Sequence, residues 1–391
     1  MVKKSFIGLV TVAFVMSLFM TPAIAKDAYK IGISMAITGP GAGTYGPMKD
    51  AIDIYFKAVN AEGGINGHPV SIIFEDNAAQ PSKAAAQAKK LVTQKKVDLL
   101  IIASLSSTYA PVIKVAKQYN VPLLFSGGVC PMAVYPPDAD SNQFCSTAFA
   151  AQYDSQFALS FIKEEATGPV KLGLAAMNIP VSRGEIDFAE KLAPTLGIEP
   201  VDKEIIPPPT PDYTPFATKI KNAGANWGYS WAPWVTQVRT FEALRKLGWQ
   251  GKYLAYAHVN AEEELQRLKD DDFYVFGTNA FFADNTPLHQ KIKDESLKEK
   301  SIHPYHKLTE GWIASMVLET IFKGTPWPPS ADKVRKSMNQ INVDLKGLKG
   351  GPMVWTMNNH YRTTTHYRVY RWDSQKNGIV IVKDWTPLEV K

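Results

Sequence analysis

Signatures of catalysis and of metal binding are missing from this sequence. It contains no GxSxG nucleophile elbow, no HExxH zinc-binding motif and no P-loop pattern. Its seven histidines are scattered, and the nearest two, His303 and His306, have Pro304 between them, which favours a solvated loop. We therefore expect neither an enzyme nor a bound metal or cofactor.

Strong charge and long apolar runs are also scarce. The formal net charge is +6, and two of those charges, Lys3 and Lys4, precede an apolar run over Phe6–Met20 and a small-x-small site at residues 23–25. This order predicts a cleaved secretory signal over residues 1–25. A membrane anchor is the alternative, but the run is short for a bilayer span. Cleavage leaves +4, which is too mild to indicate nucleic acid binding.

Cysteine is nearly absent, since Cys130 and Cys145 are the only two. Outside the cytoplasm, an even pair at this separation predicts one disulfide, closing a loop that contains Pro131, Pro136 and Pro137. A loop of this size stabilises a fold by about 3 kcal/mol if the effect is chain entropy. A metal site is not expected here, because no histidine lies close to either cysteine in the sequence.

What the sequence does contain is a stretch, Val97–Ala116, that predicts a buried strand followed by a helix. Its first half is an uninterrupted apolar run, and its second half spaces apolar residues at helical intervals. Between the halves lie four hydroxyl residues: Ser104, Ser106, Ser107 and Thr108. Hydroxyls beside the free N–H groups of a helix start can bind a carboxylate or a phosphate. Ordinary helix capping is the alternative.

The next apolar strand, Val121–Ser126, ends in Ser126, Gly127 and Gly128. Ligands of open parallel sheets gather beyond the carboxyl ends of the strands. Two successive strands that end in hydroxyls and glycines therefore favour ligand binding over capping.

A glycine motif, GxGxxG at Gly41–Gly46, lies between an expected strand, Tyr29–Ile37, and an expected helix, Pro47–Asn60. A dinucleotide site would need an acidic residue at the end of the next strand, and Glu75 or Asp76 come about ten residues late for it. We interpret the motif as a glycine loop, compatible with binding a small ligand through backbone N–H groups and Tyr45.

Strands and helices alternate in two sets of similar size. Strands are expected at Tyr29–Ile37, Val70–Phe74, Asp98–Ala103 and Val121–Ser126, and then at Val170–Ala176, Val201–Ile206, Trp227–Trp231 and Tyr253–Ala257. Two helices, Thr309–Phe322 and Ser330–Ile341, and an antiparallel tail follow. We predict an α/β fold of two Rossmann-like lobes, built from residues 27–147 with 278–350 and from 148–277 with 351–391.

Motifs spread through most of the chain carry a resemblance to a known family. They are Ile37-Thr-Gly-Pro40 with Tyr45-Gly46, Val59-Asn-Ala-Glu-Gly-Gly-Ile-Asn-Gly67, Phe74-Glu-Asp-Asn77, Gln80-Pro, Ser106-Ser-Thr108, Val121-Pro-Leu-Leu, Asp154-Ser-Gln156 and Asp212-Tyr-Thr-Pro-Phe216. The chain resembles periplasmic solute-binding proteins of ABC importers, of the leucine/isoleucine/valine type. This resemblance implies the type I periplasmic binding protein fold, in which two lobes joined by three crossovers close over a ligand cleft.

The resemblance also implies roles for particular residues. The segments that match Ser104–Thr108 and Ser126–Gly128 hold the ligand's carboxylate, and Tyr45 matches an aromatic residue that packs on the ligand. Trp231 and Trp234 match a cluster that lines the family's pocket, although either could belong to the lobe core instead. Arg183, where the family often has tyrosine, either pairs with a second polar group of the ligand or faces solvent.

One departure from the family bears on the ligand. Its amino-acid binders place an acidic residue after the strand that matches Tyr253–Tyr256, where it pairs with the ligand's ammonium, but this chain has Ala257 and His258 there. A buried ammonium without a carboxylate costs several kcal/mol. We therefore expect a small organic carboxylate with an aromatic body, with a branched-chain or other hydrophobic amino acid as the alternative.

The resemblance finally implies a location and partners. A binding component of this kind is periplasmic and works with the permease and ATPase subunits of an ABC importer. We expect a monomer that binds its small-molecule ligand and no nucleic acid. A sensor or an enzyme that uses the same fold is the remaining alternative.

Overall fold

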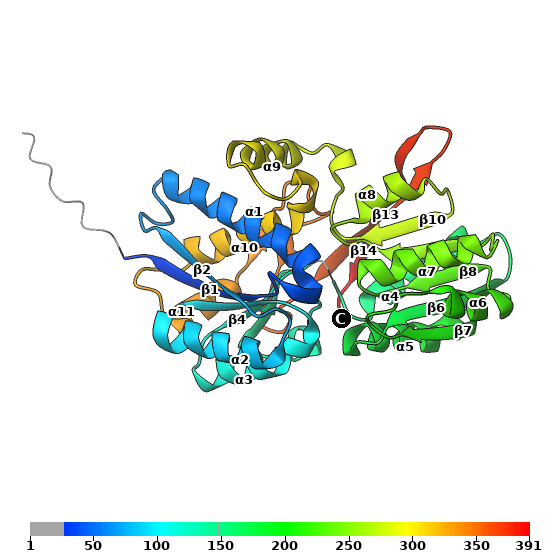
Figure 1. Ribbon diagram of the computed structural model, residues 1–391. Helices are drawn as coiled ribbons and strands as arrows, with labels where there is room; N and C mark the ends of the chain where they lie inside the picture. Colours follow the sequence, from blue (N-terminus) through cyan, green and yellow to red (C-terminus); the bar gives the residue numbers. More distant parts are fainter. Residues whose placement is uncertain (1–26, 148) are drawn as a thin grey trace, which may run out of the picture.

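The chain forms two lobes that lie side by side (Figure 1). This computed structural model describes residues 27–147 and 149–391, so the predicted signal over residues 1–25 lies outside the described residues. Each lobe has one main β-sheet with helices packed on both of its faces. The predicted two-lobe α/β fold is therefore confirmed.

The sheet of the first lobe has five parallel strands in the order β2-β1-β3-β4-β5. They are β1 (Tyr29–Met35), β2 (Val70–Asp76), β3 (Leu99–Ala103), β4 (Leu123–Phe125) and β5 (Gln143–Cys145). The helices are α1 (Ala42–Ala61), α2 (Pro81–Lys90), α3 (Tyr109–Gln118), α9 (Pro287–Lys298), α10 (Thr309–Lys323) and α11 (Ala331–Met338). Every residue of β3 is buried, because helices cover both faces of the sheet, and this burial requires the apolar run seen in the sequence.

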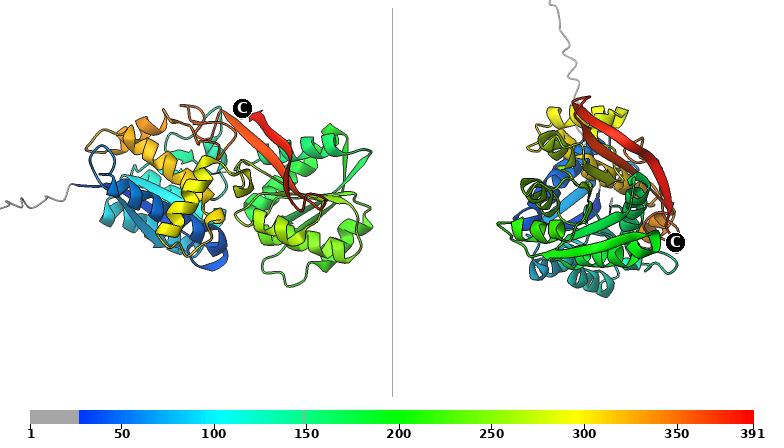
Figure 2. Two further views of the ribbon diagram at one scale, coloured as in Figure 1. Left: turned by 90° about the horizontal axis from the view of Figure 1, so that it is seen from above. Right: turned by 90° about the vertical axis from the view of Figure 1, so that its right-hand side faces the viewer.

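The sheet of the second lobe has seven strands in the order β14-β13-β10-β9-β8-β6-β7. They are β6 (Val170–Met177), β7 (Ile198–Ile206), β8 (Trp227–Ser230), β9 (Lys252–Tyr256), β10 (Phe273–Gly277), β13 (Thr364–Asp373) and β14 (Gly378–Glu389). The helices are α4 (Tyr153–Glu165), α5 (Pro180–Leu192), α6 (Thr214–Asn222), α7 (Trp234–Lys246) and α8 (Ala261–Leu268). The expected antiparallel tail is present, since β13 pairs with β10 and β14 with β13 (Figure 2).

The third crossover between the lobes comes later than expected. Strand β11 (Asn342–Val343) pairs with β12 (Met353–Val354), and Met353 and Trp355 are buried in the core of the first lobe. Further along, the N–H of Cys145 in β5 donates to the carbonyl of His360 at 2.9 Å. The segment after residue 350 thus packs with the first lobe, and the boundary expected at 351 is too early.

The glycines at 41–46 do not form the expected loop. Helix α1 begins at Ala42, so Gly43 and Gly46 lie inside it. A Cβ atom on Gly46 would lie 3.0 Å from Nε2 of His303, and one on Gly41 would lie 2.8 Å from the ring of Tyr45. Close packing, not loop flexibility, accounts for glycine at these two positions.

The predicted disulfide between Cys130 and Cys145 is confirmed. Their Cα atoms are 5.8 Å apart, and both residues are buried. The bridge ties the segment that follows β4 to the end of β5, which holds the turn at Gly127 and Gly128 against the sheet.

Candidate ligand-binding cleft

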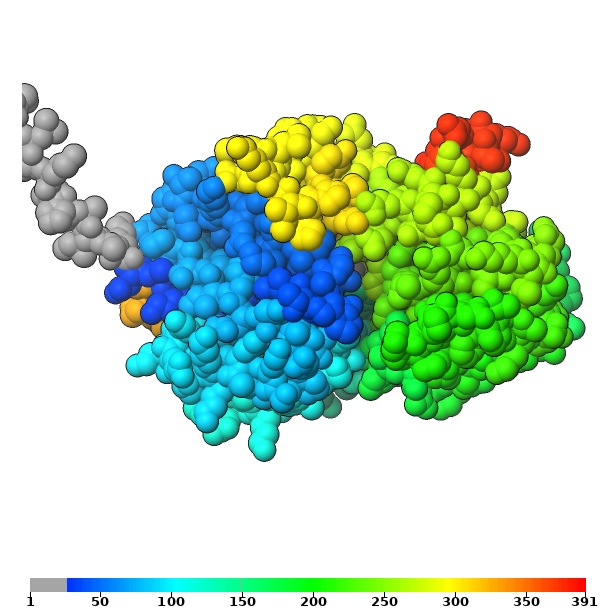
Figure 3. Space-filling model, viewed as in Figure 1, coloured from blue at the N-terminus to red at the C-terminus, as the bar shows by residue number. Residues whose placement is uncertain are grey.

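A cavity of about 650 Å³ lies between the lobes, at the carboxyl ends of their parallel strands. In Figure 3 the dark-blue start of α1 faces the green second lobe across the seam where the cavity lies. The first-lobe wall consists of Pro40, Gly41, Thr44, Tyr45, Ser104, Leu105, Ser106, Gly127, Gly128 and Val129. The second-lobe wall consists of Phe149, Met177, Ile179, Val181, Pro208, Pro209, Thr210, Tyr213, Trp231, Ala232, Pro233, Val235 and His258.

Hydroxyl groups of the first-lobe wall are held by a buried network. The Ser104 hydroxyl, at the end of β3, donates to Oδ1 of Asn77 at 2.9 Å, and Nδ2 of Asn77 donates to the Ser34 hydroxyl at 3.0 Å. All three residues are fully buried. Ser106 follows in a short 3-10 helix (Ser106–Thr108) that leads into α3. The network fixes the strand end beside the place where Ser106 meets the cavity.

Two glycines bring backbone to the cavity surface. Gly127 has a φ of +70°, which disfavours other residues. A Cβ atom on Gly128 would lie 2.3 Å from the Tyr109 hydroxyl and 3.0 Å from that of Tyr45. Only glycine fits between these two tyrosines, so the Gly127–Gly128 peptide stays accessible from the cavity.

A buried carboxylate orients the main aromatic residue of the second-lobe wall. Nε1 of Trp231 donates to Oδ2 of Asp154 at 2.9 Å, and the Tyr367 hydroxyl donates to Oδ1 at 2.7 Å. Burial, and next the nearby Glu185 carboxylate, raise the pKa of Asp154. These hydrogen bonds fix the indole plane of Trp231 where it faces the cavity.

His258 lies at the junction of the cavity with a second, smaller pocket. Its Nε2 is 2.9 Å from the carbonyl oxygen of Ala232, and its ring centroid is 5.0 Å from that of Phe149. Burial lowers the pKa of His258 to about 4. The imidazole is therefore neutral at physiological pH.

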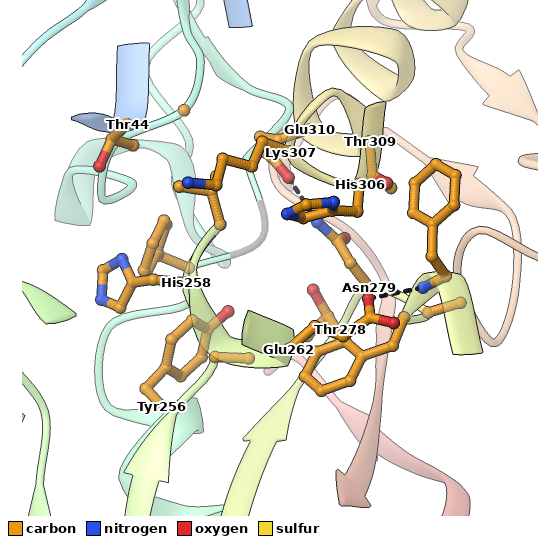
Figure 4. A pocket seen from close by; sticks show the side chains of 17 residues that line it. Thr44, Tyr256, His258, Glu262, Thr278, Asn279, His306, Lys307, Thr309 and Glu310 are labelled. Carbon is orange, nitrogen blue, oxygen red and sulfur yellow. Dashed lines mark hydrogen bonds between the residues drawn. The ribbon is translucent and has the colours of Figure 1, made fainter. Parts of the chain in front are cut away.

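The smaller pocket, of about 70 Å³, is lined by both apolar and polar side chains and lies beside the second crossover (Figure 4). Glu262, Thr278, Asn279, His306, Lys307 and Glu310 contribute its polar side chains. Nδ2 of Asn279 donates to Oε2 of Glu310 at 2.6 Å. His306, expected in a solvated loop, instead bonds through Nε2 to Glu263 of α8 at 2.8 Å, which links the lobes. Charged side chains thus line the smaller pocket, beside the second crossover.

Of the twelve expected ligand-binding residues, seven line the cavity: Tyr45, Ser104, Ser106, Gly127, Gly128, Trp231 and His258. The other five do not. Ser107 is exposed; the Thr108 hydroxyl donates to the carbonyl of Leu105; the Ser126 hydroxyl bonds to that of Ser146; Arg183 is exposed, near Asn178; and Trp234 packs against Phe273 in the lobe core. A ligand-binding role for these five has no geometric support, and the roles of the seven remain predictions.

Phe149, Ile179 and Tyr213 line the cavity but were not predicted. Ile179 comes two residues after the end of β6, so the strand-end rule, applied to the second lobe as it was to the first, would have found it. Tyr213 belongs to the Asp212-Tyr-Thr-Pro-Phe216 motif. Phe149 follows the first crossover, and no local pattern marks it.

A family comparison agrees with this geometry. Residues 28–378 match the model of a family described as periplasmic binding protein. This chain belongs to the periplasmic binding protein family. The resemblance noted in the sequence is therefore confirmed over most of the chain.

Individual relatives of this periplasmic binding protein are distant. A Leu/Ile/Val-binding protein homolog from Brucella melitensis is 24% identical over 204 residues, which are 51% of this chain and 53% of the relative. The chain thus matches about half the length of that relative.

Two solved structures share the fold. A branched-chain amino acid ABC transporter protein from Thermus thermophilus with bound valine has a TM-score of 0.81 at 15% identity, covering 93% of this chain and 97% of the other. A fatty acid ABC transporter substrate-binding protein from Thermomonospora curvata has a TM-score of 0.74 at 17% identity, covering 93% of both chains. Among the residues that the structure describes, no helix has the length and apolar character to span a bilayer.

Proposed function

We propose that this protein is the periplasmic binding component of an ABC importer and that it closes around a small organic carboxylate with an aromatic body. The family match and the cleft between two lobes support the binding role. A ligand that contacts both walls would select a closed state by bending the three crossovers. Its partners would then be the permease and ATPase subunits, and the protein would act as a monomer without catalysis.

The composition of the cavity wall carries the proposal for the ligand. No Asp, Glu, Lys or Arg is among the described residues that line the main cavity. The Ser106 hydroxyl and backbone N–H groups on one side suit a carboxylate, while Trp231, Phe149 and Tyr213 on the other offer flat apolar faces. An ammonium in this cavity would lack a carboxylate partner and would cost several kcal/mol.

A hydrophobic amino acid is the second candidate, because Glu262 and Glu310 line the adjoining pocket. An ammonium placed there would meet carboxylates. The relatives whose names include valine or leucine binding also favour this candidate.

A thermal-shift screen separates the candidates. The mature protein is melted with benzoate and phenylpropanoid acids, with leucine and valine, and with a medium-chain fatty acid. A ligand at 100 times its Kd stabilises by about 2.7 kcal/mol, which shifts the Tm measurably. We expect the aromatic acids to raise the Tm most; a shift with leucine or valine alone would overturn this ranking.

The importer role is tested separately. A strain that lacks this gene should lose high-affinity uptake of the acid that raises the Tm, and the gene restores it. Unchanged uptake in the deletion strain would contradict the role in import without touching the binding result.

A further inference from the structure

His258 has one protonation form that the structure defines. Its Nε2 lies 2.9 Å from the carbonyl oxygen of Ala232. A carbonyl oxygen accepts and does not donate, so Nε2 carries the hydrogen. In a neutral imidazole the other nitrogen, Nδ1, then keeps its lone pair and acts only as an acceptor.

The surroundings of the ring keep it neutral. Phe149 and Trp234 lie beside it, with ring centroids 5.0 and 6.3 Å away, and no described residue donates a hydrogen bond to Nδ1. The low pKa of about 4, caused by burial, agrees with a neutral ring. A ligand group that meets Nδ1 must therefore donate a hydrogen, and the neutral ring offers a cation no negative charge to offset its desolvation.

The position of the ring brings His258 to the surface of two pockets. His258 lines both the main cavity and the smaller pocket. Thr44, Gly127 and Phe149 also line both. Figure 4 shows His258 and Thr44 on the same side of the smaller pocket, opposite Asn279 and Glu310. The ring thus stands where the main cavity meets the smaller pocket, on the lobe opposite Ser104 and Ser106.

We propose that His258 selects a carboxylate whose body carries a neutral hydrogen-bond donor, above all a hydroxyl group, which donates to Nδ1. The hydroxyl end of the ligand would then be bound by the second lobe and its carboxylate end by the first. This inference rests on the proposed function, because it presupposes a carboxylate with an aromatic body in the main cavity.

Nitrogen NMR tests the form of His258 without a ligand. Long-range ¹⁵N–¹H correlation spectra of the histidine-labelled protein should show Nε2 protonated and Nδ1 unprotonated, with no titration between about pH 5.5 and pH 8. A His258→Phe variant assigns the signals. A protonated Nδ1, or a titration near pH 6.5, would overturn the proposal.

Paired acids test the selection. Affinities of benzoate, 3-hydroxybenzoate and 4-hydroxybenzoate are measured by calorimetry on the wild type and on His258→Phe. We expect one hydroxylated acid to bind about 2- to 12-fold tighter than benzoate to the wild type, the worth of one hydrogen bond. In His258→Phe this ratio should fall to about 1, while benzoate still binds.

Controls separate the selection by His258 from the proposed binding of an aromatic carboxylate. Trp234→Phe, beside the ring but off the cavity, should keep the ratio, and Ser106→Ala should weaken all three acids alike. Equal affinity of the three acids for the wild type would overturn this inference and leave the proposed function standing. Failure of all three to bind would overturn both.

Discussion

The two walls of the cleft differ in how they are built. The first-lobe wall presents hydroxyls and backbone, from Ser104, Ser106, Gly127 and Gly128, and buried hydrogen bonds hold it. The second-lobe wall presents mainly apolar side chains and includes Trp231. A polar wall needs fixed donors, whereas an apolar wall needs only shape and area.

If the proposed function holds, this difference would divide the binding of a carboxylate between the lobes. The first-lobe groups are held by hydrogen bonds within their own lobe, so they would be available to a carboxylate in an open cleft. Closure would then bring the apolar wall onto the ligand body and remove it from water. Each wall can be altered separately, and four substitution experiments test the division.

The largest effect is expected from Gly128→Ala on the first-lobe wall. The added Cβ would lie 2.3 Å from the Tyr109 hydroxyl and 2.9 Å from the Ser104 carbonyl oxygen, so the wall must shift. Such overpacking costs about 1–3 kcal/mol, or about 5- to 150-fold in affinity if the shift falls on the cavity. Gly184→Ala is the control, because nothing lies within 4 Å of its added Cβ. Calorimetry that finds unchanged affinity in G128A would contradict a backbone site at this turn.

Part of the pH dependence of stability should come from His258, in the second wall. Burial lowers the pKa of His258 from 6.5 to about 4, so between these values the unfolded chain binds a proton that the folded chain does not. The free energy of unfolding therefore falls as the pH falls, by up to about 1.4 kcal/mol per pH unit. The free energy of unfolding, measured with urea at several pH values from 4 to 7, should change less with pH in His258→Phe than in the wild type.

Two controls belong to this pH experiment. Burial likewise lowers the pKa of His289, in α9, to about 4, so His289→Phe should reduce the slope to a similar extent. Ser106→Ala, on the first wall, should leave it unchanged. An unaltered slope in H258F would show that His258 titrates normally in the folded protein.

A matched pair of tryptophans tests the apolar wall. Trp231→Phe removes the hydrogen bond to Asp154 and part of the apolar surface that lines the cavity, so we expect about a tenfold loss of affinity, or about 1.4 kcal/mol. Trp234→Phe removes an indole whose Nε1 has no hydrogen-bond partner among the described residues, and it should leave affinity unchanged. Equal losses in the two variants would mean that the effect passes through lobe stability, not through the wall.

The smallest effect is expected from single hydroxyls of the first wall. Ser106→Ala should weaken carboxylate binding by about fivefold, which is within the worth of one hydrogen bond. The adjacent Ser107→Ala should change nothing, since Ser107 is exposed and off the cavity. The same titrations measure both, and a loss in S107A equal to that in S106A would place the carboxylate elsewhere.

Much of the fold followed from local pattern. Helix α3 (Tyr109–Gln118) follows β3 as the stretch Val97–Ala116 predicted, and β3 (Leu99–Ala103) lies within the expected strand Asp98–Ala103. The third crossover could not be placed, because it depends on the pairing of β11 with β12, two short strands without a strong pattern. Local periodicity does not encode such a pairing.

The candidate site was predictable only in part. The strand-end rule located the hydroxyl segment after β3, but it could not say that Ser106 meets the cavity while Ser107 points away, since this depends on the rotation of one helical turn. No pattern in the sequence distinguishes Trp231 from Trp234 as a cavity residue. Pro233 and the start of α7 separate them, and one faces the cavity while the other enters the lobe core.

The late return of the chain to both lobes has a consequence for folding. The first-lobe core needs α10, α11 and Trp355, and the second-lobe sheet needs β13 and β14, which end at Glu389. Neither lobe has its full core until nearly the whole chain is available, so neither should fold as an independent unit. A protein cut after β10 should remain unfolded in both halves, and the intact chain should unfold in a single cooperative transition.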